Sequence, residues 1–259
     1  MLIDSFAGNQ AFPPGRYLLI DGAFVPGLHR KVADDSKRIL FESLPGCTDD
    51  TKDVSPFLTL FEPSGRKLIQ LCDRWPMVSL IQTPESLEEL SERLSAWCVI
   101  EADGQRFNFR FADTRRLPAI YRSLNAEQRG RFAGPATGWS YIARDGHWRE
   151  LELDSPGTAI AANPTLEPAQ FGSLVDDSRA DEILRLLRDR GHDVYRRPSR
   201  SHALLETALA TAAAAQLDED AVMSWCEWFW QKDQLHDLAA ARLALNAWRT
   251  AQSERANDA

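Results

Sequence analysis

Residues 77–97, MVSLIQTPESLEELSERLSAW, contain the segment that decides the fold. The apolar run from Met77 to Ile81 predicts a buried strand. Thr83 is placed to cap a helix with Pro84 at its first position, and the glutamates that follow lie near the positive end of the helix dipole. The apolar residues of that helix recur at intervals of three and four, which predicts an amphipathic helix of about four turns; they are Leu87, Leu90, Leu94 and Trp97.

The alternation of strand and helix continues on both sides of this segment. Strand-like runs occupy residues 17–20, 39–41 and 57–61, and residues 64–74 suit a helix with Leu68, Leu71 and Cys72 turned inward. Asp103-Gly104 and Asp145-Gly146 are turn pairs that each predict a β-hairpin. We therefore expect residues 1–155 to form an α/β (α+β) lobe with a mixed sheet.

The rest of the chain has a helical pattern after a connector rich in proline. Ser178 and Asp181 form a predicted capping box, and Gly191 is a predicted stop for the helix that they begin. Residues 170–259 are therefore expected to form an all-helical lobe, with further helices near residues 201–216, 219–231 and 233–250.

Composition excludes several classes of protein. The 259 residues, 44% of them hydrophobic, are enough for one large domain or two small ones. The net charge of −8 argues against a nonspecific binder of nucleic acid or anionic membrane. The four cysteines never form C-x-x-C, and the N-terminus lacks the pattern of a signal peptide, so we expect a cytoplasmic protein with reduced thiols.

The sequence lacks the common enzyme motifs. The sequence has no Gly-Lys pair for a phosphate-binding loop, no G-x-S-x-G nucleophile elbow and no histidines at metal-ligand spacing. We therefore expect no catalytic residues, cofactor or metal. The alternative is an enzyme that uses Asp21, at the end of a predicted strand, together with Asp113 as acid and base. For each of these aspartates the simpler interpretation is a turn, or a helix cap paired with an arginine.

Two features suggest protein binding. Residues 106–131 contain seven arginines against two acidic residues, a local charge of +5 in an acidic chain. A second helix-like stretch, residues 222–230, is apolar around most of its circumference and carries three tryptophans. The alternatives are a solvated face for the arginines and a core helix for the tryptophans, but arginine and tryptophan dominate binding hot spots. The candidate protein-binding residues are Arg110, Arg115, Arg116, Arg196, Arg197, Trp228 and Trp230.

The order of several segments resembles the effector adaptors, or effector chaperones, of type VI secretion systems. The resemblance spans roughly residues 16–145, and its segments are Tyr17 to Ala23, Asp53 to Leu58, Trp75 to Ile81, Ser86 to Leu90, Phe109 to Arg115 and Phe132 to Pro135. The chain departs from the family in two places. Ala112-Asp113-Thr114 stands where an aromatic residue and then Asp-Pro are frequent, and Ala133 interrupts a Phe-Gly-Pro element.

The resemblance implies a non-catalytic adaptor that binds a toxic effector in the cytoplasm and loads it onto the VgrG spike, in some cases with a PAAR-type tip protein. It implies two protein-binding surfaces, and the net charge of −8 leads us to expect no nucleic acid or membrane partner. An immunity protein that binds and neutralises a toxin remains the alternative, because it too is an acidic binding protein.

Overall fold

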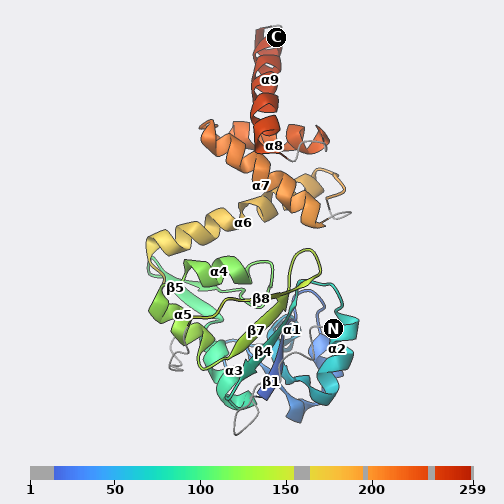
Figure 1. Cartoon of the computed structure of the whole chain (residues 1–259), viewed down its shortest axis with the longest axis vertical. Helices are drawn as coiled ribbons and strands as arrows, with labels where there is room; N and C mark the ends of the chain where they lie inside the picture. Colours follow the sequence, from blue (N-terminus) through green and yellow to red (C-terminus); the bar gives the residue numbers. More distant parts are fainter. Residues whose placement is uncertain (1–14, 155–163, 195–197, 233–236, 258–259) are drawn as a thin grey trace. The chain divides into compact units, whose positions relative to one another are not determined.

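The computed structural model describes residues 15–154, 164–194, 198–232 and 237–257. The chain divides into two compact units, one that ends at Leu174 and one that begins at Val175 (Figure 1). Both sheets belong to the first unit, and the described residues of the second unit form helices and their connections. The expected α/β lobe followed by a helical lobe is therefore confirmed.

A six-stranded sheet forms the centre of the first unit, in the order β2-β3-β1-β4-β7-β8. Its strands are β1 (Gly15–Asp21), β2 (Lys37–Ile39), β3 (Pro56–Leu60), β4 (Val78–Thr83), β7 (Gly138–Ile142) and β8 (Trp148–Glu150). Neighbouring strands are antiparallel at every pairing, so the expectation of a mixed sheet is wrong in this detail. The reason is that β1 lies between β3 and β4. These two strands run parallel to each other and are joined by α2 (Arg66–Leu71), but they are not neighbours.

Both faces of the sheet are buried. Tyr17, Leu19 and Trp139 lie in one core with side chains of three helices, α3 (Leu87–Ala96), α4 (Leu117–Ser123) and α5 (Ala126–Ala133). Leu18 and Ile20, which alternate with them along the strand, pack on the other face in a core that includes Leu68 of α2. Figure 1 shows α3, α4 and α5 on one side of the sheet and α2 on the other.

Shorter elements complete the first unit. The hairpin of β5 (Val99–Ala102) and β6 (Gln105–Asn108) turns at Asp103 and Gly104, which both have positive φ, as the Asp-Gly pair predicts. The remaining short elements are α1 (Asp49–Asp53), a π-helical turn (Phe61–Gly65) and two 3-10 turns (Leu28–Lys31 and Asp34–Ser36).

Helix α3 begins later than the sequence predicts. Its N-cap is Ser86, which forms a capping box with Glu89, and not Thr83. The Thr83 hydroxyl instead donates a hydrogen bond to the Glu85 carboxylate, at 2.8 Å. Glu85 is in turn held by Arg93, so Thr83 belongs to a buried polar cluster.

Two other details of the predicted helices are wrong. Leu71 is 60% exposed, because the short α2 packs on the sheet through Leu68, Ile69 and the following Cys72 instead. Ser178 does not begin a helix: α6 runs without interruption from Pro168 to Asp189, and the Ser178 hydroxyl donates to the Val175 carbonyl. A serine side chain that bonds within the preceding turn is compatible with a helix interior.

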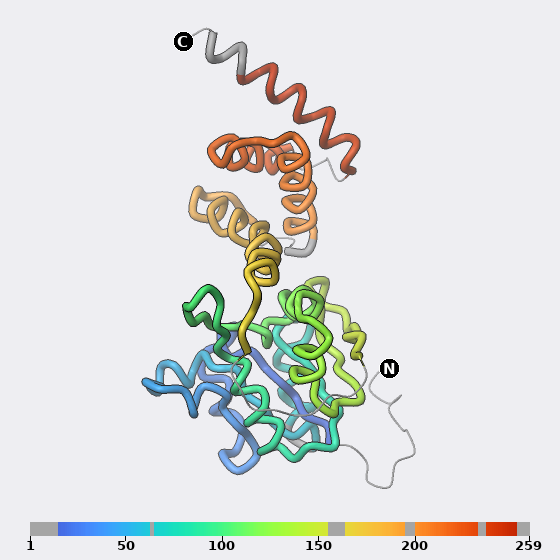
Figure 2. The backbone as a smooth tube through the Cα atoms, turned by 90° about the vertical axis from the view of Figure 1, so that its left-hand side faces the viewer, coloured from blue at the N-terminus to red at the C-terminus, as the bar shows by residue number. Residues whose placement is uncertain are grey.

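The second unit consists of the end of α6 and of α7 (Pro198–Ala214), α8 (Glu219–Lys232) and α9 (Leu238–Asn257), traced from yellow to red in Figure 2. Its core includes Leu205, Trp225, Phe229 and Trp248. Gly191 has a φ of +92°, and the N–H of the next residue donates to the Leu187 carbonyl, which confirms the predicted stop of the helix.

Candidate functional site

The structure brings together two of the segments that carry the family resemblance. Asp21 ends β1, and Arg110 and Asp113 follow β6. One guanidinium nitrogen of Arg110, Nη2, lies 2.8 Å from Asp21 Oδ2 and 3.6 Å from Asp113 Oδ2. The two aspartates of the enzyme alternative therefore converge, although they are 92 positions apart (113 − 21) in the sequence.

Both carboxylates are buried and already bonded. Asp21 Oδ1 accepts a hydrogen bond from the backbone N–H of Ala23, at 3.0 Å. Asp113 accepts two hydrogen bonds from the Arg115 guanidinium, at 2.6 and 2.9 Å, and one from the Arg115 backbone N–H at 3.1 Å. Burial raises the pKa of Asp21 above its ordinary value, and the positive charge of Arg110 opposes that rise.

The chain around this aspartate–arginine network (Asp21, Arg110, Asp113 and Arg115) is fixed by the backbone as well. The Thr114 N–H donates to the Pro76 carbonyl at 3.2 Å, and the Thr114 hydroxyl donates to the Ile142 carbonyl of β7. The Arg115 guanidinium lies 4.9 Å from the centre of the Phe24 ring, within the range of a cation–π contact. The network thus ties the end of β1 to β7 and to the approach to α4.

This arrangement favours a structural role for the two aspartates. A general base needs a lone pair that can reach a substrate proton, and a general acid needs a proton to give. Here each carboxylate accepts from a cation and from a backbone N–H, and the two positive charges balance the two negative ones. The simpler interpretation from the sequence describes Asp21, which is a turn residue, and is half right for Asp113. Asp113 pairs with an arginine as expected, but it does not cap α4, whose N-cap position is Arg116.

Most arginines of the window 106–131 are bonded within the first unit. Arg116 donates to the Leu174 carbonyl at 2.8 Å, and Arg129 and Arg131 form ion pairs with Asp154 and Glu127. Arg122 is exposed and has no hydrogen bond or ion pair among the described residues. Arg196 and Arg197 lie outside the described residues.

The tryptophans of α8 divide into one core residue and two half-buried ones. Trp225 is fully buried and donates to the Ala208 carbonyl at 3.0 Å. Trp228 stacks on Trp225 with ring centres 5.5 Å apart, and the Lys232 ammonium lies 5.1 Å from the centre of the Trp228 ring. Trp228 and Trp230 are each half-buried at the edge of the core, so each retains a surface that a partner could contact.

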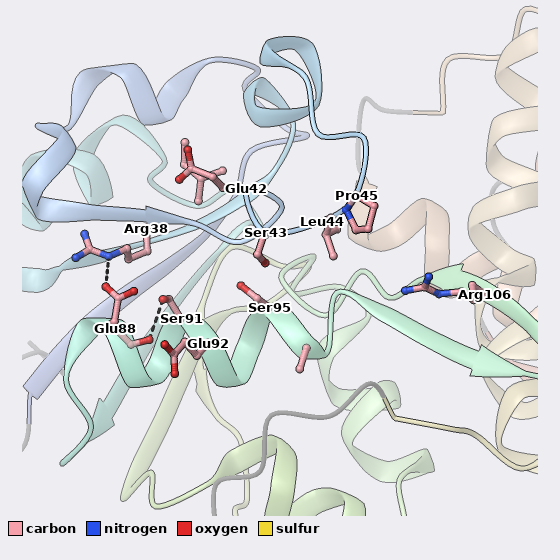
Figure 3. Close-up of a pocket in the computed structure, with 12 residues that line it drawn as sticks. Arg38, Glu42, Ser43, Leu44, Pro45, Glu88, Ser91, Glu92, Ser95 and Arg106 are labelled. Carbon is pink, nitrogen blue, oxygen red and sulfur yellow. Dashed lines mark hydrogen bonds and ion pairs between the residues drawn. The ribbon is translucent and has the colours of Figure 1, made fainter.

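The structure also contains a groove that the sequence did not reveal. A cavity of about 670 Å³ lies between the segment 38–45 and α3 (Figure 3). Arg38 is bonded to Glu88 at one end, Arg106 lies at the other, and Ser43 and Ser95 point toward one another across the groove. Its only sequence signal is the set of small residues on one side of α3, namely Ser91, Ser95 and Ala96.

A second cavity, of about 310 Å³, lies beside the edge strand β8. Pro118, Tyr121 and Arg122 of α4 line one side, and Tyr141 of β7 and the chain from Glu150 to Glu152 line the other. Among the residues that the structure describes, no group of histidine, cysteine or acidic side chains is arranged to hold a metal ion, and no helix is long and apolar enough to cross a membrane.

Comparison with known proteins identifies one family. Residues 16–131, slightly less than half of the chain, match the model described as "Domain of unknown function (DUF4123)". No curated protein and no solved structure is matched. The match begins in β1 and ends within α5, so it contains all four residues of the aspartate–arginine network. Residues 16–131 of the first unit are therefore similar to this family of domains, whose description gives no function.

Proposed function

We propose that this protein is a non-catalytic adaptor that binds a type VI secretion effector in the cytoplasm and loads it onto the VgrG spike, in some cases with a PAAR-type tip protein. One unit would hold the effector and the other would contact the spike. The observation that carries the proposal is the coincidence of the DUF4123 match with the segments that resemble effector adaptors.

The roles of the matched residues support binding over catalysis. Asp21, Arg110 and Asp113 come from two of those segments, and they are engaged with one another in a network that holds the domain together. Residues used in this way support a rigid domain that acts by binding other proteins at its surface. The alternative of a small enzyme with Asp21 and Asp113 as acid and base gains no support from this geometry.

The candidate contact residues differ in how well they suit a partner. Arg110, Arg115 and Arg116 are partly exposed but are bonded internally, so a partner would have to share them. Trp228 and Trp230 present half-buried rings that a partner could cover, and tryptophan is enriched among binding hot spots. Arg196 and Arg197 stay candidates on the sequence alone.

Deletion of the gene in the producing bacterium tests the proposal. An adaptor is expected to be required for export of the toxin encoded nearby, while the producer stays resistant to that toxin. Loss of self-protection with normal export would instead identify an immunity protein, the second candidate. Unchanged export and unchanged protection would contradict both.

Pull-down with charge-reversed variants tests the arginine surface. We expect the double variant Arg115→Glu, Arg116→Glu to lose one partner while it retains the other. The matched control is Arg185→Glu, Arg188→Glu, a pair of exposed arginines on α6 that both form ion pairs with Asp189. Because Arg115 holds the buried Asp113, circular dichroism must show that the test variant is folded. Unchanged binding of every partner by a folded variant would exclude the arginine surface.

A further inference from the structure

The two edges of the six-stranded sheet differ in whether their outward peptide groups are occupied. On β2, the Lys37 carbonyl accepts from the Arg38 guanidinium at 2.8 Å, and the Ile39 carbonyl accepts from the Glu42 N–H at 3.1 Å. These contacts occupy the acceptors that an added strand would need. The groove in Figure 3 therefore lies beside an edge that is already closed.

The β8 edge is open in the described part of the chain. The Ala143 N–H donates to the His147 carbonyl, and the Leu151 N–H donates to the Trp139 carbonyl. In an antiparallel pair the residues alternate between bonding to the neighbour and facing away, so the peptide groups of Trp148 and Glu150 point away from β7. No described residue bonds to these groups.

The cavity beside β8 lies where a side chain of an added strand would enter. Leu151 and Tyr141 face the same side of the sheet and line this cavity, together with Pro118 and Tyr121 of α4. A strand bonded to Trp148 and Glu150 would place its next side chain on that face, because side chains alternate between faces. The lining combines apolar surface from Pro118, Leu151 and the two tyrosine rings with five charged side chains. The charged residues are Arg122, Arg129, Glu150, Glu152 and Asp154. The apolar part of the lining suits an apolar side chain of the added strand.

We propose that β8 binds an extended segment of another protein by strand addition, with one apolar side chain of that segment in the cavity between β8 and α4. The segment would form hydrogen bonds with the N–H and C=O groups of Trp148 and Glu150. The cavity would give specificity for segments with an apolar side chain at the position that enters it. This site uses none of the candidate arginines and tryptophans above, and the proposal holds whether or not the bound protein is a secretion effector.

A second copy of this chain fits the edge poorly. Antiparallel pairing of two β8 strands that uses both Trp148 and Glu150 is centred on Arg149. It sets the Arg149 residues of the two chains, each ion-paired at 2.7 Å with Asp145 of its own chain, directly opposite each other. Like charges at opposed positions destabilise a strand pair. The charges on the edge thus favour a different protein as the partner.

Selection of a random-peptide phage library on the purified full chain tests the site without knowledge of the natural partner. We expect enriched peptides of alternating, strand-like sequence with an apolar residue at a fixed position. The variant Glu150→Pro removes the outward N–H but leaves the bonds to β7 in place. The matched control Glu150→Ala removes the same carboxylate and keeps the N–H.

Affinity of an enriched peptide, measured by fluorescence polarisation, is expected to fall about tenfold in Glu150→Pro and to stay near the wild-type value in Glu150→Ala. Equal melting temperatures of the two variants would show that the loss is local. In the wild-type complex, hydrogen exchange is expected to slow at the amides of Trp148 and Glu150, and not at those of Ala143 and Leu151, which are bonded already.

Three outcomes would overturn the proposal. The first is that the wild-type chain enriches no peptide beyond the level of Glu150→Pro. The second is that enriched peptides bind both variants equally well. The third is that the wild-type chain is a dimer that Glu150→Pro converts to a monomer, because the edge would then belong to a second copy. If the chain does not bind the toxin that is encoded near its gene, that result would count against the proposed function and not against this site.

Discussion

Replacing Arg93 with methionine should markedly lower the melting temperature of the first unit. The Arg93 and Glu85 side chains are 1% and 6% exposed, and they form a bidentate ion pair at 2.7 and 2.5 Å. Arg93 also donates to the Phe132 carbonyl at the end of α5. A Cβ atom on Gly134 would lie 2.5 Å from Arg93 Nε, so the chain closes tightly around the guanidinium.

The size of the effect follows from the burial of the pair. Removing one partner leaves an uncompensated carboxylate in the interior, which costs about 3–5 kcal/mol of the free energy of unfolding. For a domain of this size, each kcal/mol lowers the melting temperature by about 2–4 °C, so the expected decrease is about 6–20 °C. The double variant Glu85→Leu, Arg93→Met should recover most of that loss, because it removes both charges.

Differential scanning calorimetry measures the transition directly. The control is Lys52→Met, which breaks the ion pair between Lys52 and Glu42 on the surface of the same unit and should cost less than about 1 kcal/mol. If Arg93→Met lowers the melting temperature no further than Lys52→Met does, the argument from burial is wrong. If the double variant is less stable than Arg93→Met, the uncompensated charge is not the cause.

Three further predictions concern Asp21, Glu227 and Trp225. Because burial raises the pKa of Asp21 above 3.8, the folded state holds its proton more tightly, so urea unfolding should show wild-type stability falling relative to Asp21→Asn as the pH rises from about 4. The hydrogen bond from His192 lowers the pKa of Glu227 below 4.5. Glu227→Gln should therefore lower the free energy of unfolding by at most about 1 kcal/mol at neutral pH. This difference in stability should vanish as the pH falls through the lowered pKa of Glu227. Trp225→Ala should cost the second unit about 3–5 kcal/mol in thermal unfolding, and a similar cost for the half-buried Trp230→Ala would contradict the assignment of Trp225 to the core.

Local patterns predicted the elements well and the arrangement of strands less well. The periodicity of residues 77–97 identified β4 and α3, and the two Asp-Gly pairs identified the hairpins. Periodicity did not reveal that β1 lies between β3 and β4, because strand order is decided by which faces pack together and not by the sequence of one strand. The start of α3 was misplaced because Thr83 and Ser86 are both good caps, and the buried Arg93–Glu85 pair uses Thr83 for another contact.

The cavity beside β8 had no visible pattern in the sequence. The open edge of β8 depends on which end of the sheet the strand occupies and on which of its residues bond to β7. The cavity beside it combines α4, β7 and the chain after β8, and no local motif links these segments. Side-chain types are readable from sequence, but the absence of a neighbouring strand is a property of the assembled sheet.

The arginine window shows why a local excess of charge is weak evidence for a binding surface. Residues 106–131 carry a charge of +5 in the sequence, but Arg110 is bonded to Asp21 and Arg129 to Asp154, two aspartates outside the window. The fold thus supplies anions that a count along the chain cannot include. Arg122, which has no such partner among the described residues, lies at the rim of the cavity beside β8. Arg122 is therefore located at the open sheet edge, where a bound segment with an acidic residue next to its apolar anchor would gain an ion pair.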